Sequence, residues 1–210
     1  MYSIFIPYLF SFIFNTQVQQ NTEMQGEIII ELSQNNLNKK YLVKYKNEKI
    51  RLDYISANGE NVNSLLIDLD ENRIFELNNI RKSYRTVNPN SYTVSVTNLS
   101  LKKEPSSTTI QGYNCEKWLI INSLNQTKIE YKIAKNKNFQ YLKNVLKYID
   151  KENSMFSALE ALSSDSDIFP ISATEYDKKG TILMSAKISI QMNKKTEDFY
   201  FIIPENFKAW

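Results

Sequence analysis

The feature that most limits what this chain can fold into is an alternation of apolar and polar side chains with a period of two. It dominates from Gly26 onward and is typical of strands that bury one face against a core. The clearest apolar positions are Tyr41, Val43 and Tyr45, followed by Ile50, Leu52 and Tyr54. Asn47-Glu48 separates the two runs, so we expect a hairpin there.

The same pattern predicts strands along most of the chain. A second hairpin joins Ser64 to Asp68 with Arg73 to Leu77 through Asp70, Glu71 and Asn72, whose side chains can hydrogen-bond their own backbone. Further strands are expected at Ser83 to Val87, Tyr92 to Thr97, Thr108 to Gln111, Cys115 to Ile121, Lys128 to Ile133, Ile168 to Tyr176, Thr181 to Met192 and Asp198 to Ile203. Short strands with regular turn signals predict one large antiparallel sheet.

The segment from Thr181 to Met192 has the longest clean alternation. Its apolar side carries Ile182, Met184, Ala186, Ile188, Ile190 and Met192. We therefore expect this strand at the centre of the sheet.

A helical period interrupts the strands between 138 and 162. Leu142, Val145, Leu146 and Ile149 fall at i, i+3, i+4 and i+7, which predicts a helix from about Asn138 to Ile149. A second helix is expected from Asn153 to Leu162, with the Ser-rich stretch from Ser163 to Asp167 as the loop that ends it. The fold class expected is thus α+β and mostly β, with about two helices covering the sheet.

The first twenty residues have a different character. Tyr2 to Phe14 is almost wholly apolar and uncharged. This segment is shorter than the roughly 20 residues needed to span a bilayer, but it has the length of the apolar h-region of a secretory signal. We expect residues 1–20 to be a signal peptide, with a buried N-terminal strand or helix as the alternative, and residues 21–210 to be a single extracytoplasmic domain, periplasmic or secreted. No transmembrane segment is expected after cleavage.

The charge and the single cysteine exclude some partners. The net charge is +3, and Lys and Arg are dispersed among Asp and Glu, so the concentrated basic footprint of a nucleic-acid binder is missing. Cys115 has no partner for an intrachain disulfide, and we expect it to be buried as a small apolar residue, the alternatives being a reactive thiol or an intermolecular bridge.

The absence of histidine limits the chemistry further. Without it, Ser-His-Asp and Cys-His centres and Cys/His zinc sites are excluded, and we expect no cofactor. Two groups of acidic residues could serve as calcium ligands or paired carboxylates, but in both an ordinary turn is the stronger interpretation. They are Asp68, Asp70 and Glu71, and Asp165 and Asp167.

Several stretches together resemble one family of exported bacterial proteins. They are GEIIIELS from Gly26, YLVKYKNEKIRLDY from Tyr41, LLIDLDENRIFEL from Leu65, SYRTV from Ser83, TIQGYNCEKW from Thr109, FPISATEYDKKG from Phe169 and FIIPENFK from Phe201. The stretch from Thr109 carries Ile110, Gly112, Tyr113, Cys115 and Lys117, with Trp118 at its end, and is the most specific match. The family is DUF4412, a domain of unknown function, related in fold to the LolA-like lipoprotein carriers.

The resemblance implies an unclosed half-barrel, a strongly curved antiparallel sheet whose hollow is covered by helices. In the carriers such a hollow holds acyl chains, but no residue set here transfers that activity. Gly112, Tyr113, Cys115 and Trp118 are interpreted as a structural motif.

Two functions remain open, and a catalytic function is a third, less favoured hypothesis. The first is binding of a lipid or other acyl-chain ligand in the hollow, which would be lined by Ile182, Met184, Ile188, Ile190, Met192, Leu142 and Leu146. The second is an envelope or secreted module that binds a protein partner and whose hollow is a filled core. An enzyme is not expected.

Overall fold

The computed structural model describes residues 23–35, 37–89, 98–140, 142–146, 148–149, 154–162 and 165–210. The predicted signal peptide and the strand predicted from Tyr92 to Thr97 lie outside the described residues. All statements of structure below concern the described part of the chain.

Twelve strands form one sheet. They are β1 (Gln25–Gln34), β2 (Leu37–Lys46), β3 (Lys49–Ile55), β4 (Asn61–Asp68), β5 (Arg73–Asn78), β6 (Ser83–Val87), β7 (Leu99–Ile110), β8 (Tyr113–Asn122), β9 (Thr127–Lys135), β10 (Ile168–Tyr176), β11 (Ile182–Met192) and β12 (Lys208–Ala209). Their spatial order is β12-β6-β5-β4-β3-β2-β1-β11-β10-β9-β8-β7, and every pair is antiparallel except β12 with β6. The mostly antiparallel sheet predicted from the alternation is confirmed.

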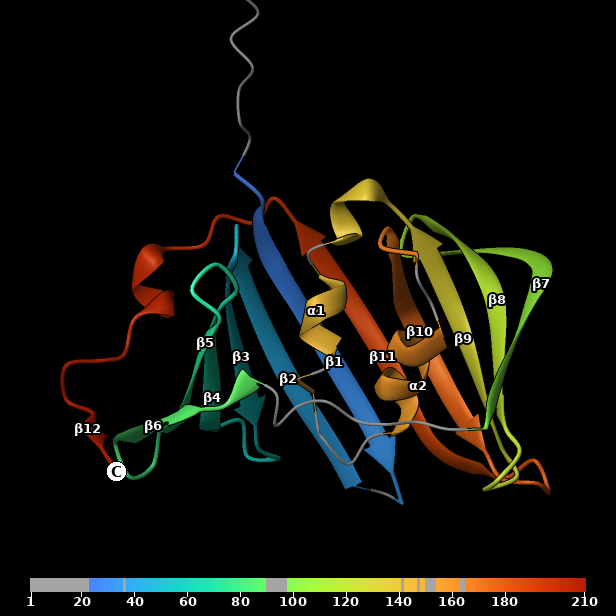
Figure 1. The fold of residues 1–210 in the computed structure, drawn as a ribbon, viewed down its shortest axis with the longest axis horizontal. Coiled ribbons are helices and arrows are strands. Elements are labelled where there is room, and N and C mark those ends of the chain that lie inside the picture. The colour runs from blue at the N-terminus through green and yellow to red at the C-terminus, as the bar shows by residue number, and fades with distance from the viewer. Residues whose placement is uncertain are drawn as a thin grey trace, which may run out of the picture.

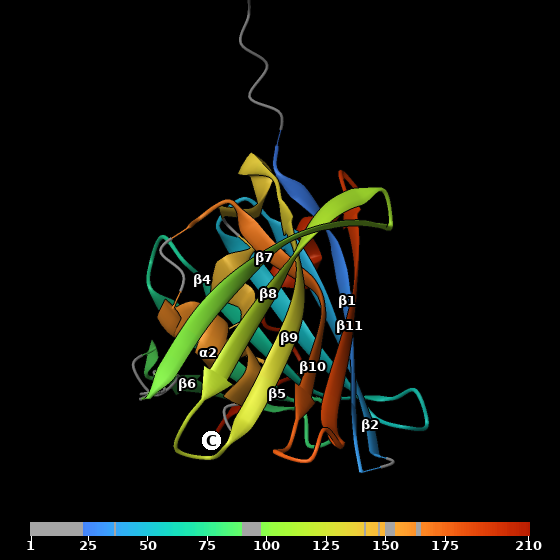
Figure 2. The same ribbon diagram turned by 90° about the vertical axis from the view of Figure 1, so that its right-hand side faces the viewer.

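Two meanders make up this order, and β1 joins them by pairing with β11. Ile30 lies opposite Ile188 in that pair, so the predicted central position of the Thr181 to Met192 strand is confirmed. The sheet curves and stays open, because β7 and β12 are its two edges and do not pair (Figures 1 and 2).

Gly26 marks a close approach within the central strands. A Cβ atom on this residue would lie 2.5 Å from the carbonyl oxygen of Gln191 and would also strike the Tyr45 ring. Since real Cβ atoms do not come this close to a backbone oxygen, the sheet needs glycine here.

One face of the sheet carries the core. Along β2, Tyr41, Val43 and Tyr45 are buried while the residues between them are partly exposed, as the alternation predicts. These side chains join one hydrophobic cluster with residues of β1, β3, β8–β11 and of residues 136–167, which connect β9 to β10. We call residues 136–167 the cover, because its helices lie inside the curve of the sheet (Figures 1 and 2).

The cover contains fewer regular helices than expected. The helix predicted from Asn138 to Ile149 is replaced by a 3-10 turn, η2 (Lys137–Gln140), and a four-residue helix, α1 (Lys143–Leu146). Backbone hydrogen bonds here span three residues, as from Leu142 N to Phe139 O at 2.9 Å and from Val145 N to Leu142 O at 2.9 Å. Turns of three residues also place residues three apart on one side, as for the buried positions 142, 145 and 148, so apolar residues at that spacing do not distinguish such turns from an α-helix.

The second helix is where it was predicted, as α2 (Ser154–Leu162). It is the only helix of more than one turn in the described residues, so the expectation of about two covering helices is wrong.

The end of the chain also departs from the prediction. Asp198 to Ile203 is not a strand: it begins with a 3-10 turn, η3 (Asp198–Phe201), in a segment, the C-terminal arm (residues 193–210), that ends in β12. The arm is held on the outer face of the sheet, where Lys46 Nζ lies 2.8 Å from Asp198 Oδ1 and Arg51 Nη1 donates to the Tyr200 carbonyl at 3.2 Å. Strands β2 and β3 beneath it already have partners on both sides, so no sheet edge is free to take a strand there.

Candidate functional site

Four of the five predicted ligand-lining residues of β11, Met184, Ile188, Ile190 and Met192, lie on the inner face. Ile188 is fully buried, and Met184, Ile190 and Met192 are partly buried against the core cluster. Ile182 begins the strand and is 60% exposed, outside that cluster. Ile182 pairs with Tyr176, a residue of the outer face, after a register shift, so it is not part of the inner face.

The two predicted lining residues of the cover are packed against that face. Leu142 is 1% exposed and Leu146 is 2% exposed, while Ile188 is 0% exposed. A side chain with no accessible surface is touched by protein atoms on every side, so no water-sized space borders Ile188 in this conformation. The structure gathers Leu142, Leu146 and Ile188 in one core.

The motif from Gly112 to Trp118 supports the cover from below. Gln111 and Gly112 both have positive φ, 52° and 81°, and connect Ile110 to its partner Tyr113 as a two-residue hairpin turn. The Tyr113 ring lies 5.6 Å from that of Phe139 in η2, centroid to centroid, which links the hairpin to the start of the cover.

The remaining two motif residues are interior. Cys115 is buried, its thiol donates to the Tyr113 carbonyl at 3.5 Å, and burial raises the pKa of the thiol. Trp118 is fully buried, and its Nε1 donates to Glu116 Oε2 at 3.0 Å. These contacts give Cys115 and Trp118 structural surroundings, with no opening through which a reactive thiol would act.

A buried tyrosine ties α2 to the sheet. The hydroxyl of Tyr131, on β9, donates a hydrogen bond to the carbonyl oxygen of Met155 in α2. Tyr131 is fully buried, and this burial raises the pKa of its hydroxyl well above the ordinary value. At the base of the cover, Asn136 N donates to the Asp167 carbonyl at 2.8 Å, and this hydrogen bond joins the two ends of the cover.

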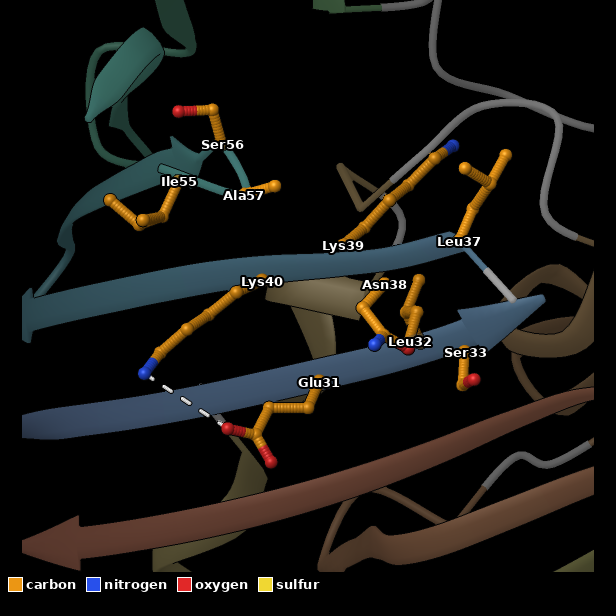
Figure 3. A pocket seen from close by; sticks show the side chains of 10 residues that line it. All are labelled: Glu31, Leu32, Ser33, Leu37, Asn38, Lys39, Lys40, Ile55, Ser56 and Ala57. Carbon is orange, nitrogen blue, oxygen red and sulfur yellow. Dashed lines mark ion pairs between the residues drawn. The ribbon is translucent and has the colours of Figure 1, made fainter. Parts of the chain in front are cut away.

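A pocket that was not predicted lies at the ends of β1, β2 and β3. It has a volume of about 670 Å³ and is lined by residues 31–33, 37–40 and 55–57, and we call it the rim pocket (Figure 3). Leu37 and Lys39 extend to one side of β2, while Lys40 extends to the other and lies 4.0 Å from Glu31, nitrogen to oxygen (Figure 3).

The two sides of the rim pocket follow from the strand alternation. Lys39 has the same parity as the buried Tyr41 and Val43, so it belongs to the inner face, and it lies opposite the core residue Leu32 in the β1–β2 pairing. The sequence feature that could have identified the rim pocket is Lys39, a lysine at an inward position just before the inward apolar residues that begin at Tyr41.

The acidic groups considered for metal binding lie in turns or ion pairs. Asp68 Oδ1 accepts a hydrogen bond from Glu71 N at 3.0 Å, and Asp165 lies 3.1 Å from Lys103 Nζ. Within the described residues no three side chains of Cys, Asp or Glu are grouped closely enough to hold a metal ion.

A second polar cluster lies on the outer face beneath the C-terminal arm. Asp53 Oδ1 accepts from Ser64 Oγ at 2.6 Å, from Arg51 Nε at 2.7 Å and from Asn61 Nδ2 at 2.9 Å. Asp53 and Ser64 are both buried, and Arg51 uses its other nitrogens to bind Ser64 and the arm. The cluster holds the arm in place through the Arg51 guanidinium. The Ser64 hydroxyl is buried, and the base beside it among the described residues is the Asp53 carboxylate to which it donates.

The described helices include none with both the length and the apolar character needed to cross a membrane.

Comparison with known proteins identifies a family and a fold. The family described as "Domain of unknown function (DUF4412)" matches residues 24–207, and no curated protein matches the chain. An uncharacterized conserved protein from Thermus thermophilus has a similar crystal structure, with a TM-score of 0.51 at 12% identity over 91% of each chain.

Two further structures are more distant. PNGF-II aligns with a TM-score of 0.45 at 13% identity, over 89% of this chain and 31% of that one. A DUF1329 family protein from Desulfovibrio piger aligns with a TM-score of 0.34 at 9% identity, over 89% of this chain and 92% of that one. Of these three, the Thermus protein alone is similar enough to support the fold. At 12% identity, the similarity does not support a shared function.

Proposed function

We propose that this chain, which belongs to the DUF4412 family of domains of unknown function, is an exported, non-catalytic protein. It would bind a hydrophobic or lipid-like ligand. The ligand would lie between the inner face of the curved sheet and the cover. This is the arrangement that the resemblance to LolA-like carriers implies. The predicted signal peptide supports an extracytoplasmic location, and the absence of histidine supports a non-catalytic role.

The observation that carries the proposal is the insertion of the cover between two adjacent strands. β9 and β10 are antiparallel neighbours, and such strands need only a short turn, as the two residues between β7 and β8 show. Instead, the described residues between β9 and β10 form η2, α1 and α2, which lie against the inner face of the sheet. The usual connection in a hairpin is about two to five residues long, so this insertion is far longer than the pairing of β9 with β10 requires.

The underside of the cover is apolar, and this gives a ligand its binding energy. The buried side chains that it contributes are Phe139, Leu142, Val145, Leu146, Tyr148, Ile149, Met155, Phe156, Ala158 and Leu159. An acyl chain that took the place of some of these contacts would bury a similar apolar surface, worth about 25 cal/mol per Å². The ligand's own removal from water would then supply affinity, and a long chain needs no charged anchor.

Because no space borders Ile188 in the described conformation, ligand entry requires the cover to shift. The described conformation would be the closed one, and the ligand would select a state in which the cover has moved from the sheet.

The same observation supports a second candidate function. A filled core beside Ile188, Leu142 and Leu146 is what an envelope or secreted interaction module would have, with no small ligand. Such a protein would act through its surface, and its cover would be a permanent part of the core.

Native mass spectrometry of the protein purified from its own host, followed by solvent extraction, tests the first proposal. We expect a co-purifying lipid-like species and binding of a hydrophobic dye that fatty acids displace. Recovery of no such species, together with no dye binding, would favour the interaction module.

A matched pair of variants locates the site. Ile188→Phe enlarges a fully buried side chain and should weaken dye binding, whereas Ile182→Phe changes an exposed position of the same strand outside the core cluster and should not. Equal effects of the two changes would place the dye elsewhere.

A further inference from the structure

We propose that the tip of the β7–β8 hairpin (residues 110–113) is the gate through which a hydrophobic ligand enters between the sheet and the cover, and that Gln111 is its latch. This rests on the proposed function, and it adds the side by which the ligand enters and leaves. It also assigns a role to the turn of the motif that the sequence singled out.

The gate lies where two neighbouring strands separate. β10 and β11 pair only as far as Ser172 with Lys187. β11 continues to Met192 and stays paired with β1 over that whole length. Within the described residues, no strand takes the place of β10 beside residues 188–192. This part of β11 therefore has a strand neighbour on one side and an opening on the other.

The cause of the separation lies in β10. Its pairing with β9 shifts in register between Pro170 and Ser172. Such a bulge bends the strand that carries it, and a proline has no N–H to donate to a neighbouring strand. The part of β10 before the bulge, from Ile168 to Pro170, pairs with β9 and not with β11. β10 thus follows β9 and leaves β11.

The hairpin tip closes the opening. Gln111 Nε2 donates a hydrogen bond to the carbonyl oxygen of Ile188 at 2.7 Å. Ile188 is the first residue of β11 beyond the pairing with β10. The tip therefore lies against β11 at the point where β10 has left it, and Figure 2 shows the β7–β8 hairpin reaching toward that strand. One side-chain hydrogen bond stands where a strand ladder ends.

The opening leads directly to the apolar interior. Ile188 is fully buried in the core cluster, and Tyr113, Ile190 and Met192 are partly buried against it. The Tyr113 ring also lies 5.6 Å from that of Phe139, so the tip touches the first turn of the cover. Displacement of the tip would uncover apolar side chains of both β11 and the cover. An acyl chain that passed there would meet uncharged residues.

A gate changes the rates of binding more than the affinity. The latch joins two parts of the protein, so it can form again over a bound ligand. Loss of one hydrogen bond of ordinary strength should raise the population of the open gate about fivefold. Entry and exit should then both become about fivefold faster, while their ratio, the dissociation constant, stays the same.

Stopped-flow fluorescence with the methyl ester of cis-parinaric acid tests the inference. Gln111→Met keeps the length of the side chain and removes the donor, so the association and dissociation rates should both rise about fivefold. Thr109→Val is the matched control, because it removes a hydrogen bond to Asn114 Oδ1 at 3.1 Å within the same hairpin that does not involve β11. Its rates should equal those of the unmodified protein.

A second variant tests the latch itself. In Gln111→Glu a carboxylate faces the Ile188 carbonyl at neutral pH and cannot donate, whereas the protonated carboxyl group can. The rates should therefore be high at neutral pH and return toward those of the unmodified protein in acid. Because the ester probe has no titratable group, the ligand does not change over this range. Gln111→Met should show no such recovery.

The outcomes separate the gate from the proposed function. Unchanged rates in Gln111→Met, an equal acceleration in Thr109→Val, or no recovery of Gln111→Glu in acid would overturn the gate. The hydrophobic site would stand in each case, because the unmodified protein would still bind the probe. If the unmodified protein binds no probe, the proposed function itself is wrong.

Discussion

Replacing Tyr131 by phenylalanine is the change that most selectively loosens the cover. The substitution removes one oxygen atom and keeps the ring, which is fully buried in β9. What is lost is the hydrogen bond from the Tyr131 hydroxyl to the carbonyl of Met155 in α2. The volume of the side chain hardly changes, so the packing of the core around the ring is kept.

The expected magnitude follows from the value of one buried hydrogen bond. Its net contribution is about 1 kcal/mol, so Tyr131→Phe should lower the free energy of unfolding by about that amount. If the ligand binds only when the cover has shifted, the same loss of about 1 kcal/mol raises the population of the competent state about fivefold. The apparent affinity for a ligand should then rise about fivefold, although the protein is less stable.

The assay combines chemical denaturation with titration of a fluorescent fatty acid. Ser64→Ala is the matched control, because it removes a buried hydroxyl that donates to Asp53 at 2.6 Å on the outer face, far from the cover in the fold. It should destabilise the protein by about 1–3 kcal/mol and leave ligand affinity unchanged. Tighter binding by both variants, or by neither, would refute a cover that opens for the ligand.

Three other perturbations test parts of the fold. Gly26→Ala should destabilise the protein by well over the roughly 1–2 kcal/mol expected for Gly112→Ala, because the first meets a backbone oxygen and the second only a positive φ of 81°, and denaturation curves that rank them in reverse would contradict this. The Cys115 thiol should react with Ellman's reagent only after unfolding, so rapid reaction of the native protein would show that it is accessible. The hydrogen bond from Lys46 lowers the pKa of the Asp198 carboxyl. Its contribution to stability is therefore present at neutral pH and lost as the pH falls through that lowered pKa, and the difference in melting temperature between the unmodified protein and Asp198→Asn should disappear in the same acidic range.

The strands could be predicted because their signal is local. The inward positions of β2 from Tyr41 onward and those of β3 are apolar, and a turn residue such as Asn47, with φ of 52°, ends the run where the hairpin reverses. Strand β7 could be predicted only at its end, from Thr108, because Lys102 and Lys103 interrupt its apolar pattern and its residues Leu99 and Leu101 contact the core from an edge.

The structures of the cover and the C-terminal arm could not be predicted from local sequence alone. Leu142, Val145 and Ile149 are buried as the apolar spacing required, but whether three-residue or four-residue hydrogen bonds bring them there is decided by packing against the sheet. The arm lacks a strand at Asp198 because β2 and β3 are already paired, which no local pattern records.

The candidate site was predicted in its apolar part and missed in its polar part. Ile188, Leu142 and Leu146 do meet in one core, since periodicity identifies inward faces. The rim pocket is built by three strand ends whose register places Lys39 opposite Leu32 and Lys40 opposite Ile55. Register over such separations is a property of the whole sheet, so only the structure brings these residues together.

The central claim is that a hydrophobic ligand enters between the sheet and the cover. Nuclear magnetic resonance of the methyl-labelled protein with a fatty acid tests it most directly, because intermolecular contacts to single methyl groups can be assigned. The account predicts contacts from the fatty-acid chain to the methyl groups of Ile188 and Leu146, both buried in the described conformation. Saturating fatty acid that gives no contact to either residue, and leaves their chemical shifts unchanged, would contradict it.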